Sequence, residues 1–178
     1  MTPRAGLLLL LWSAAAAAQS PPGGFDQAFD GDERPWREIE AKLPAYPLPE
    51  NLVKIDAGAT ASSRYYVDTA SLSVDPDGVV RYSVVVKSAY GAESVSYEGI
   101  RCDTRERRSY AFGRPDGSWS RARSSRWERI QANLAQTRYQ MTLYGDYFCP
   151  EGRIAGDRKE VLDGLRRGQN WRLDDFRQ

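Results

Sequence analysis

The sequence predicts an α+β fold: a twisted antiparallel β-sheet, a meander of about five or six strands, with one or two C-terminal helices packed on it. From Asn51 to about Trp127, apolar and polar residues alternate with the period of two that is typical of strands. After Arg126 the apolar residues recur near helical spacing, up to Leu143. Short connections rich in turn residues separate the strands, and strands joined in this way run antiparallel.

Each expected strand is an alternating run between turn signals. Asp75–Gly78 has proline at the second and glycine at the fourth position, the pattern of a type I turn, and Pro115–Gly117 marks a second hairpin turn. The expected strands are 51–57, 64–74 (ending in a turn or short 3₁₀ segment), 79–90, 92–103 and a hairpin over 107–127.

The alternation assigns the residues of the strand 92–103 to two faces of the sheet. One face carries Val95, Tyr97, Gly99 and Arg101. The other carries Ser94, Ser96, Glu98, Ile100 and Cys102.

Two helices are expected after the strands. The first covers at least Tyr139 to Phe148 and packs on the sheet. The second begins at Asp157, where Glu160 completes a capping box, and it ends at Gly168. Its apolar face consists of Val161, Leu162 and Leu165.

The N-terminal part of the domain is expected to be a short helix followed by an extended segment. Asp32 can cap a helix that runs through Lys42, with Pro35 in its first turn. Three prolines follow between Pro44 and Pro49, and they favour an extended path. This path is either a strap over the sheet, with Tyr46 and Leu48 packing inward, or a proline-rich ligand for a partner.

The first residues have the pattern of a cleaved secretory signal. Arg4 precedes an apolar run that is too short to span a bilayer, and three alanines precede Gln19. We therefore expect a signal peptide at 1–18, a flexible leader at 19–34, a single α+β domain at 35–170 and a tail at 171–178. The mature chain is expected in the periplasm or at the cell surface, without a transmembrane segment.

The chain has no histidine, which excludes Ser–His–Asp and Cys–His catalysis, histidine metal ligands and a histidine proton shuttle. We expect no catalytic residue, no metal site and no cofactor, although carboxylate, Ser–Lys or Tyr chemistry stays open. Asp146 and Glu151 are weak candidates for acid–base chemistry. The charge is uneven: residues 19–100 carry seven basic and thirteen acidic side chains, and residues 101–178 carry seventeen and eleven.

Cys102 and Cys149 are the two cysteines of the chain. Neighbouring arginines would lower the pKa of a free Cys102 thiol, but a nucleophilic cysteine needs a base, and no histidine is present. In an exported protein, two cysteines indicate a disulfide. We expect Cys102 to end a central strand on the face that is covered by the helix carrying Cys149.

The arginines of the second half are candidate contacts to an anion or another ligand, since guanidinium groups match carboxylates and phosphates. The alternative is a solvated hairpin with local ion pairs. A second hypothesis is an acidic-glycan groove, in which Arg121, Arg123, Arg126 and Arg129 lie between Trp119 and Trp127; the alternative is that both tryptophans belong to the core. The candidate ligand contacts are Arg105, Arg107, Arg108, Arg121, Arg123 and Trp119.

Several segments resemble a family of exported proteobacterial proteins. They are "PWREIEAKLPAYP", "RYYVDTASLSVDPDGVVRYSVVVKS", "YEGIRC" and "LYGDYFCPEG". Over roughly Pro35 to Gly168 the chain resembles the cryptic neisserial protein 1-like family, which implies a location in the envelope but no activity. A more distant similarity to the surface-adhesin protein E-like domain implies a twisted antiparallel sheet tied to a helix by a disulfide.

These observations favour an exported envelope protein that is a non-enzymatic binding or accessory module. The alternatives are a surface adhesin for host or matrix proteins and a carboxylate-based enzyme without histidine. The expected partner is an envelope protein or an acidic polymer, and nucleic acid is a poor candidate for an exported chain that is neutral after cleavage.

Overall fold

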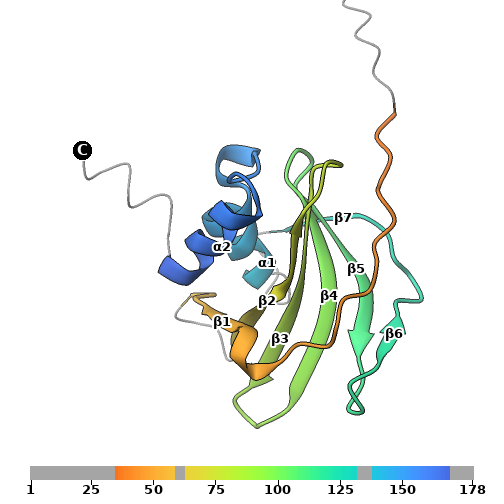
Figure 1. The fold of residues 1–178 in the computed structure, drawn as a ribbon, viewed down its shortest axis with the longest axis vertical. Helices are drawn as coiled ribbons and strands as arrows, with labels where there is room; N and C mark the ends of the chain where they lie inside the picture. The colour runs from red at the N-terminus through yellow and green to blue at the C-terminus, as the bar shows by residue number, and fades with distance from the viewer. Residues whose placement is uncertain (1–34, 59–62, 132–137, 169–178) are drawn as a thin grey trace, which may run out of the picture. The chain divides into compact units, whose positions relative to one another are not determined.

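The computed structural model describes residues 35–58, 63–131 and 138–168. In it β1 to β6 lie side by side in chain order in one antiparallel sheet, and β7 pairs with β5 (Figure 1). The α+β meander is therefore confirmed. The strands are β1 (Leu52–Ile55), β2 (Ser63–Val74), β3 (Val79–Ser88), β4 (Glu93–Arg101), β5 (Glu106–Gly113), β6 (Trp119–Arg121) and β7 (Glu128–Arg129), and a 3₁₀ turn, η1 (Pro49–Asn51), precedes β1.

Three sequence predictions fall outside the described residues. They concern the signal peptide at 1–18, the leader at 19–34 and the tail at 171–178. All three stay predictions.

The tight turns lie where glycine and proline predict them. The Gly78 N–H donates to the Asp75 carbonyl at 3.0 Å between β2 and β3, and the Gly117 N–H donates to the Arg114 carbonyl at 3.0 Å between β5 and β6. Both glycines have positive φ angles, 80° and 79°, a region that glycine enters without strain. Each short turn returns the chain directly to the preceding strand.

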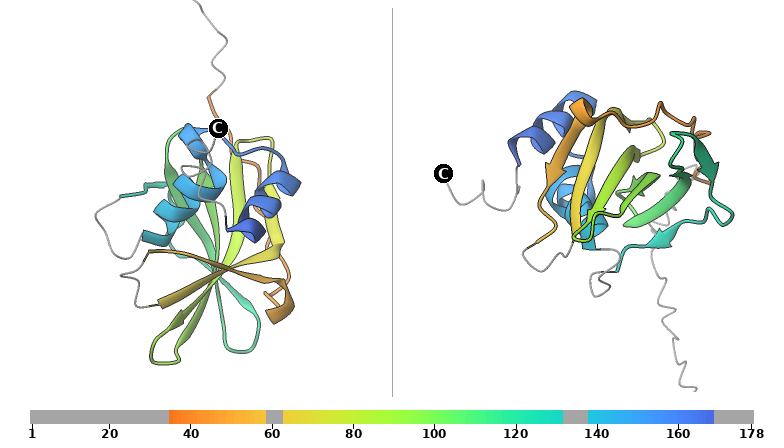
Figure 2. Two further views of the ribbon diagram at one scale, coloured as in Figure 1. Left: turned by 90° about the vertical axis from the view of Figure 1, so that its left-hand side faces the viewer. Right: turned by 90° about the horizontal axis from the view of Figure 1, so that it is seen from below.

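Helices cover one face of the sheet (Figure 2). Asp157 and Glu160 form the predicted capping box, and Gly168 ends the last helix in a left-handed conformation. The helical spacing begins later than Trp127, because Glu128 and Arg129 pair with β5 as β7. Neither α-helix of the described part is long and apolar enough to cross a bilayer. The helical elements are α1 (Arg138–Thr142), the π-helical turn η3 (Leu143–Phe148), the 3₁₀ turn η4 (Pro150–Gly152) and α2 (Arg158–Arg167).

The main hydrophobic core lies between the sheet and these helices. Val80, Tyr82 and Val84 are alternate residues of β3, so they share the face that the helices cover, and all three are fully buried. Phe148 packs its ring 5.1 Å from that of Tyr82, and Leu165 of α2 joins the same core. Full burial of one such side chain stabilises the fold by about 1.5–3 kcal/mol.

Strand β2 does not end in the expected turn or 3₁₀ segment. It continues through a register shift between Asp68 and Ser73, the mark of a bulge. Near this bulge the carbonyl oxygens of Thr69 and Leu72 accept hydrogen bonds from the Arg158 guanidinium at 3.0 and 2.7 Å. The irregular stretch therefore supplies acceptors that tie the first turn of α2 to the sheet.

The predicted disulfide is confirmed. The sulfur atoms of Cys102 and Cys149 are bonded at 2.08 Å, and the Cα atoms are 5.3 Å apart. Cys102 follows β4 on the face of Ile100, and Cys149 follows η3, so the bond ties the helical layer to the sheet. The Tyr144 hydroxyl adds a hydrogen bond to the Cys102 carbonyl at 3.2 Å.

The expected helix from Asp32 to Lys42 is wrong over its described part. Residues Trp36–Leu48, which we call the strap, run extended over the face of the sheet opposite the helices (Figure 1). The Ile39 N–H donates to Asp77 Oδ2 at 2.8 Å, and the Ile39 carbonyl accepts from Arg81 at 3.0 Å. Because a helix would need these backbone groups for its own hydrogen bonds, their use by the sheet holds the strap extended.

The packing of the strap is as expected at Tyr46 but not at Leu48. The Tyr46 ring lies 5.4 Å from that of Trp119, and a Cβ atom at Gly113 would come within 2.8 Å of it, so glycine leaves the necessary space. Leu48 is 52% exposed. Leu43 packs against the sheet instead.

We predict that the double variant Cys102→Ser/Cys149→Ser keeps the fold but loses up to about 4 kcal/mol of unfolding free energy, because the bond restricts a loop of this length in the unfolded chain. Urea unfolding followed by circular dichroism measures the loss. Reduced wild-type protein is the control and should match the variant. An unchanged urea midpoint in the variant would show that the bond does not constrain the unfolded chain.

Candidate functional site

Five exposed arginines follow one edge of the sheet. They lie in the segment that leaves β5 and returns through β6 and β7 to pair with it. We call them the arginine edge: Arg114, Arg121, Arg123, Arg126 and Arg129. Of the predicted ligand contacts, Arg121 and Arg123 belong to this edge. The other four make contacts within the protein.

Local ion pairs account for part of the arginine-rich hairpin between β4 and β5. Arg101 donates to both carboxylate oxygens of Asp103 at 2.9 Å, and these hydrogen bonds hold the pKa of Asp103 below its ordinary value. Arg107 donates to Glu128 of β7 at 2.9 Å. These contacts fit the alternative in which acidic and basic side chains of the hairpins pair with one another.

Trp119 and Trp127 both hold the strap. The Trp119 indole N–H donates to the Pro44 carbonyl at 2.9 Å. The Trp127 indole N–H donates to Glu38 at 3.1 Å, and its ring makes an edge contact with Trp36 at 5.8 Å. Both rings are thus engaged with the strap, and each remains half-buried.

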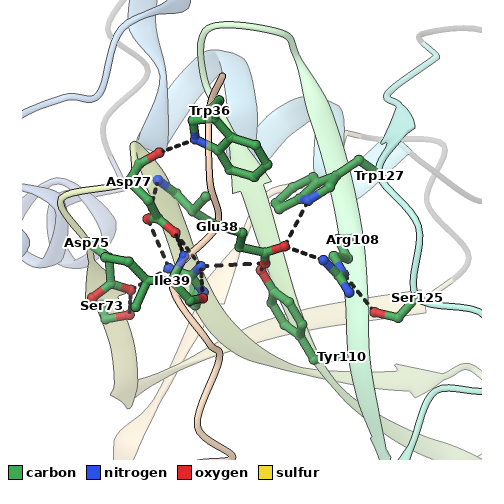
Figure 3. Close-up of polar contacts among 12 residues, drawn as sticks. Trp36, Glu38, Ile39, Ser73, Asp75, Asp77, Arg108, Tyr110, Ser125 and Trp127 are labelled. Carbon is green, nitrogen blue, oxygen red and sulfur yellow. Dashed lines mark hydrogen bonds and ion pairs between the residues drawn. The ribbon is translucent and has the colours of Figure 1, made fainter. Parts of the chain in front are cut away.

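Arg108 belongs to a polar cluster beneath the strap (Figure 3). It donates to the Glu38 carboxylate and, from Nε, to Ser125 at 2.7 Å. Glu38 also accepts from the Tyr110 hydroxyl at 2.6 Å and from Trp127. The hypothesis of a merely solvated hairpin is therefore wrong at Arg108, whose partner lies 70 residues away in the chain.

The same cluster contains a buried guanidinium, that of Arg81 in β3, whose side chain is 2% exposed. It donates to both oxygens of Asp77 at 2.6 and 3.1 Å and to Asp75 at 2.7 Å, and Glu38 lies 3.5 Å away. Figure 3 shows these carboxylates converging from the strap and from the turn before β3. Their charges compensate a cation that would be costly to bury alone.

The cluster shifts the pKa of its own members. Burial alone would raise the pKa of Asp77, but hydrogen bonds from Arg81 and from backbone N–H groups hold it below its ordinary value. Burial would lower the pKa of Arg81, yet its carboxylate partners raise it, so the cation persists. Burial and the bond to Glu38 raise the pKa of Tyr110, which keeps the phenol protonated as a donor. This cluster is built to hold the strap.

A second buried polar cluster lies on the opposite face, beneath α1. Glu98 of β4 is 3% exposed, and each of its carboxylate oxygens accepts two hydrogen bonds. Ser96 and Tyr139 donate to Oε1, both at 2.7 Å, while Tyr82 and Gln140 donate to Oε2 at 3.1 and 3.3 Å. Burial, and then the charge of Glu98, raise the pKa of both tyrosines well above the ordinary value, so both remain donors.

An open cavity of about 440 Å³, which we call the Glu98 pocket, lies beside this carboxylate. Its volume falls within the range of small-molecule sites, about 300–1,000 Å³. Tyr65 stacks on Tyr139 with ring centroids 4.9 Å apart, and Phe112 is 49% exposed. The polar lining residues are Ser94, Ser96, Glu98, Arg107, Ser109 and Gln140.

A larger cavity of about 770 Å³ lies next to the disulfide at Cys149. It brings together the two carboxylates considered for acid–base chemistry, Asp146 and Glu151, with Arg105. Arg105 and Glu151 both have left-handed φ angles, 55° and 54°, and Arg105 donates to the Met141 sulfur at 3.3 Å. Within residues 35–58, 63–131 and 138–168, no three or more Cys, Asp or Glu side chains are grouped so as to hold a metal ion.

The sequence predictions missed the Glu98 pocket, although β4 contains a signal for it. Ser94, Ser96 and Glu98 alternate onto the same face as Ile100 and Cys102, which was expected to be covered by a helix. Polar side chains on a covered face need buried partners. Their presence at one end of this face therefore indicated a polar site under the helix.

Comparison with known proteins gives two matches. The family model described as CNP1-like family matches residues 31–166. The chain is also 24% identical, over 153 residues, to the protein named cryptic neisserial protein 1 of Neisseria gonorrhoeae (strain ATCC 700825 / FA 1090), an alignment that covers 75% of this chain and 72% of that protein. No solved structure matches the chain.

We predict that Glu38→Gln lowers the free energy of unfolding by about 2 kcal/mol, because the variant loses a charged acceptor and turns an amide N–H₂ toward other donors. Glu40→Gln is the matched control, since Glu40 lies two residues away in the strap and is exposed. Urea unfolding of both variants is the measurement. If Glu38→Gln and Glu40→Gln lower the free energy of unfolding by the same amount, the strap is not held through the Glu38 carboxylate.

We predict that the stability contributed by Asp77 depends on pH. Since its folded pKa is lowered, the contribution is complete above the ordinary carboxyl pKa of about 3.9 and is lost as the pH falls through the folded value. Asp77→Asn should therefore be less stable than wild type at neutral pH, with a gap that narrows below about pH 4.

Urea unfolding at several pH values measures this gap. Asp163→Asn is the control, because the exposed pair of Asp163 with Lys159 is screened by solvent and should show a much smaller gap. A gap for Asp77→Asn that stays constant from neutral to acid pH would contradict the assignment.

Proposed function

This chain belongs to the CNP1-like family, and we propose that it works as an exported, non-enzymatic binding module of the cell envelope. Its proposed partner is an acidic polysaccharide, held along the arginine edge. The observation that carries this proposal is the row of exposed guanidinium groups at Arg114, Arg121, Arg123, Arg126 and Arg129.

The arginine edge has few acidic neighbours in its own segment. Between residues 114 and 129 the acidic residues are Asp116, which accepts hydrogen bonds from Ser118, and Glu128, which pairs with Arg107. Among the described residues, Arg121, Arg123, Arg126 and Arg129 form no ion pair within 4.0 Å. These cations are therefore available to an external anion.

A polymer of repeating negative charge fits such a row better than a single small anion does. Each exposed ion pair contributes at most about 1 kcal/mol, because solvent and salt screen it. Several pairs made by one chain add their effects once the first is formed. Carboxylate groups along a polysaccharide suit the planar guanidinium fork.

The interactions of Glu98 and its tyrosines favour binding over acid–base catalysis. Both oxygens of Glu98 are occupied by donors, so the carboxylate is not free to take a proton from a substrate. Tyr82 and Tyr139 have raised pKa values, which disfavours a tyrosinate base at neutral pH.

Export is supported by the signal-like residues 1–18 and by the buried disulfide of Cys102 and Cys149. Disulfides persist in oxidising compartments such as the periplasm. The periplasm or the cell surface is therefore the proposed location.

We predict that the wild-type protein binds immobilised polygalacturonate, a carboxylate polysaccharide, and is released by added salt. The triple variant Arg121→Ser/Arg123→Ser/Arg126→Ser should bind about tenfold more weakly, since about 0.5 kcal/mol is lost at each position. The matched control is Arg64→Ser/Arg153→Ser/Arg166→Ser, which removes three exposed arginines from other parts of the chain.

The control should bind nearly as tightly as wild type. If both triple variants bind the polysaccharide more weakly by the same factor, retention depends on the net charge of the protein. That result would contradict a binding site at the arginine edge. Absence of retention at low salt would reject an acidic polysaccharide as the partner.

A further inference from the structure

The Glu98 pocket lies outside the arginine edge and combines a rigid floor with an open mouth. Its floor is the Glu98 carboxylate, fixed by four donors. One wall is the stacked pair Tyr65 and Tyr139, and the ring of Phe112 is half exposed at another. Apolar walls with a few fixed polar groups are the usual composition of a small-ligand site.

The two charged residues that line the pocket, Glu98 and Arg107, already have partners within the protein. Glu98 accepts four hydrogen bonds, and Arg107 pairs with Glu128 at 2.9 Å. Because neither charge is left for a ligand of the opposite sign, the pocket favours a neutral ligand.

Two buried polar atoms of the lining residues lack a partner. Gln140 Oε1 is an acceptor and Arg107 Nε is a donor, and neither has a hydrogen bond among the described residues. Gln140 itself is only 3% exposed. Buried polar atoms are normally paired, so this donor and this acceptor mark a place for a further polar group.

We propose that the Glu98 pocket binds a small neutral ligand that carries hydroxyl groups, of the chemical type of a single sugar ring. A hydroxyl group both donates and accepts, so it can donate to Gln140 Oε1 and accept from Arg107 Nε once a small side-chain movement exposes these buried atoms. The C–H face of the ring packs against the exposed ring of Phe112. The sugar is either free or the end of a neutral glycan.

The test is a titration of the intact, disulfide-bonded protein, followed by NMR of its amide groups. Glucose is the neutral probe, and glucuronate and glucosamine are the matched anionic and cationic probes. Glucose should give saturable shifts at the Gln140 side-chain amide and at Phe112, with a dissociation constant on the order of 1 mM. Maltotriose, a short neutral glycan, distinguishes the two sources: tighter binding than glucose assigns the site to a glycan end, and weaker binding to a free sugar.

Phe112→Ala removes the exposed wall, and Tyr90→Ala is its matched control, because Tyr90 is a 99% exposed aromatic residue that does not line the pocket. Phe112→Ala should weaken glucose binding about tenfold, and Tyr90→Ala should leave it unchanged. Equal melting temperatures of the two variants exclude unfolding as the cause.

Three results would overturn the proposal. Without saturable shifts from glucose or maltotriose, the two unpaired atoms would be assigned to bound water. Shifts that are the same in Phe112→Ala and wild type would place the sugar elsewhere. Tighter binding of glucuronate or glucosamine than of glucose would contradict a neutral ligand. None of these results depends on the arginine edge, whose own test uses a polyanion.

Discussion

The buried guanidinium of Arg81 is the constraint on which one half of the structure depends. A cation in the middle strands of a sheet is tolerated only with carboxylates and acceptors around it. Asp75 and Asp77 come from the neighbouring turn, but Glu38 and the carbonyl of Ile39 come from the strap. The two aspartates already balance this one charge, and the strap adds the Ile39 carbonyl as a further acceptor for the guanidinium. This contact ties the strap to the sheet, and the strap in turn covers the apolar residues of that face.

The opposite face also buries a charged group, but one of negative charge. Glu98 is buried beneath α1, and two tyrosines, a serine and a glutamine supply its hydrogen bonds. At the other end of β4 the Cys102–Cys149 disulfide ties the helical layer to the sheet, next to the apolar core. The interface between sheet and helices thus changes along β4 from a covalent, apolar end to a polar end with an open pocket.

Both faces of the sheet are covered, so the two proposed binding sites lie beside the covered surfaces. The strap occupies one face and the helices the other; the exposed arginines lie along β6, β7 and the loops beside them, and a cavity opens next to the buried Glu98 and α1. Arg121 and Arg129 of the arginine edge lie on strands and the other three arginines in the connecting loops, whereas the Glu98 pocket is formed by strands and by α1. The hydrogen bonds that occupy the buried acid and phenols support the proposed binding role.

Local pattern was sufficient to predict much of the fold from the sequence. The alternating strands, the turn at Asp75–Gly78, the capping box at Asp157 and the disulfide all depend on neighbours in the chain or on a count of cysteines, and each is confirmed. The arginines of the arginine edge were also evident in the sequence, because they cluster between residues 114 and 129. Tertiary structure alone decided that the strap is extended before Leu43, where a helix was expected, that Arg108 pairs with Glu38 and that Glu98 lines a pocket. Each of these features depends on hydrogen-bond partners about 40 to 70 residues away in the chain. A prediction from sequence assumes that the same groups bond to nearby residues or to solvent instead.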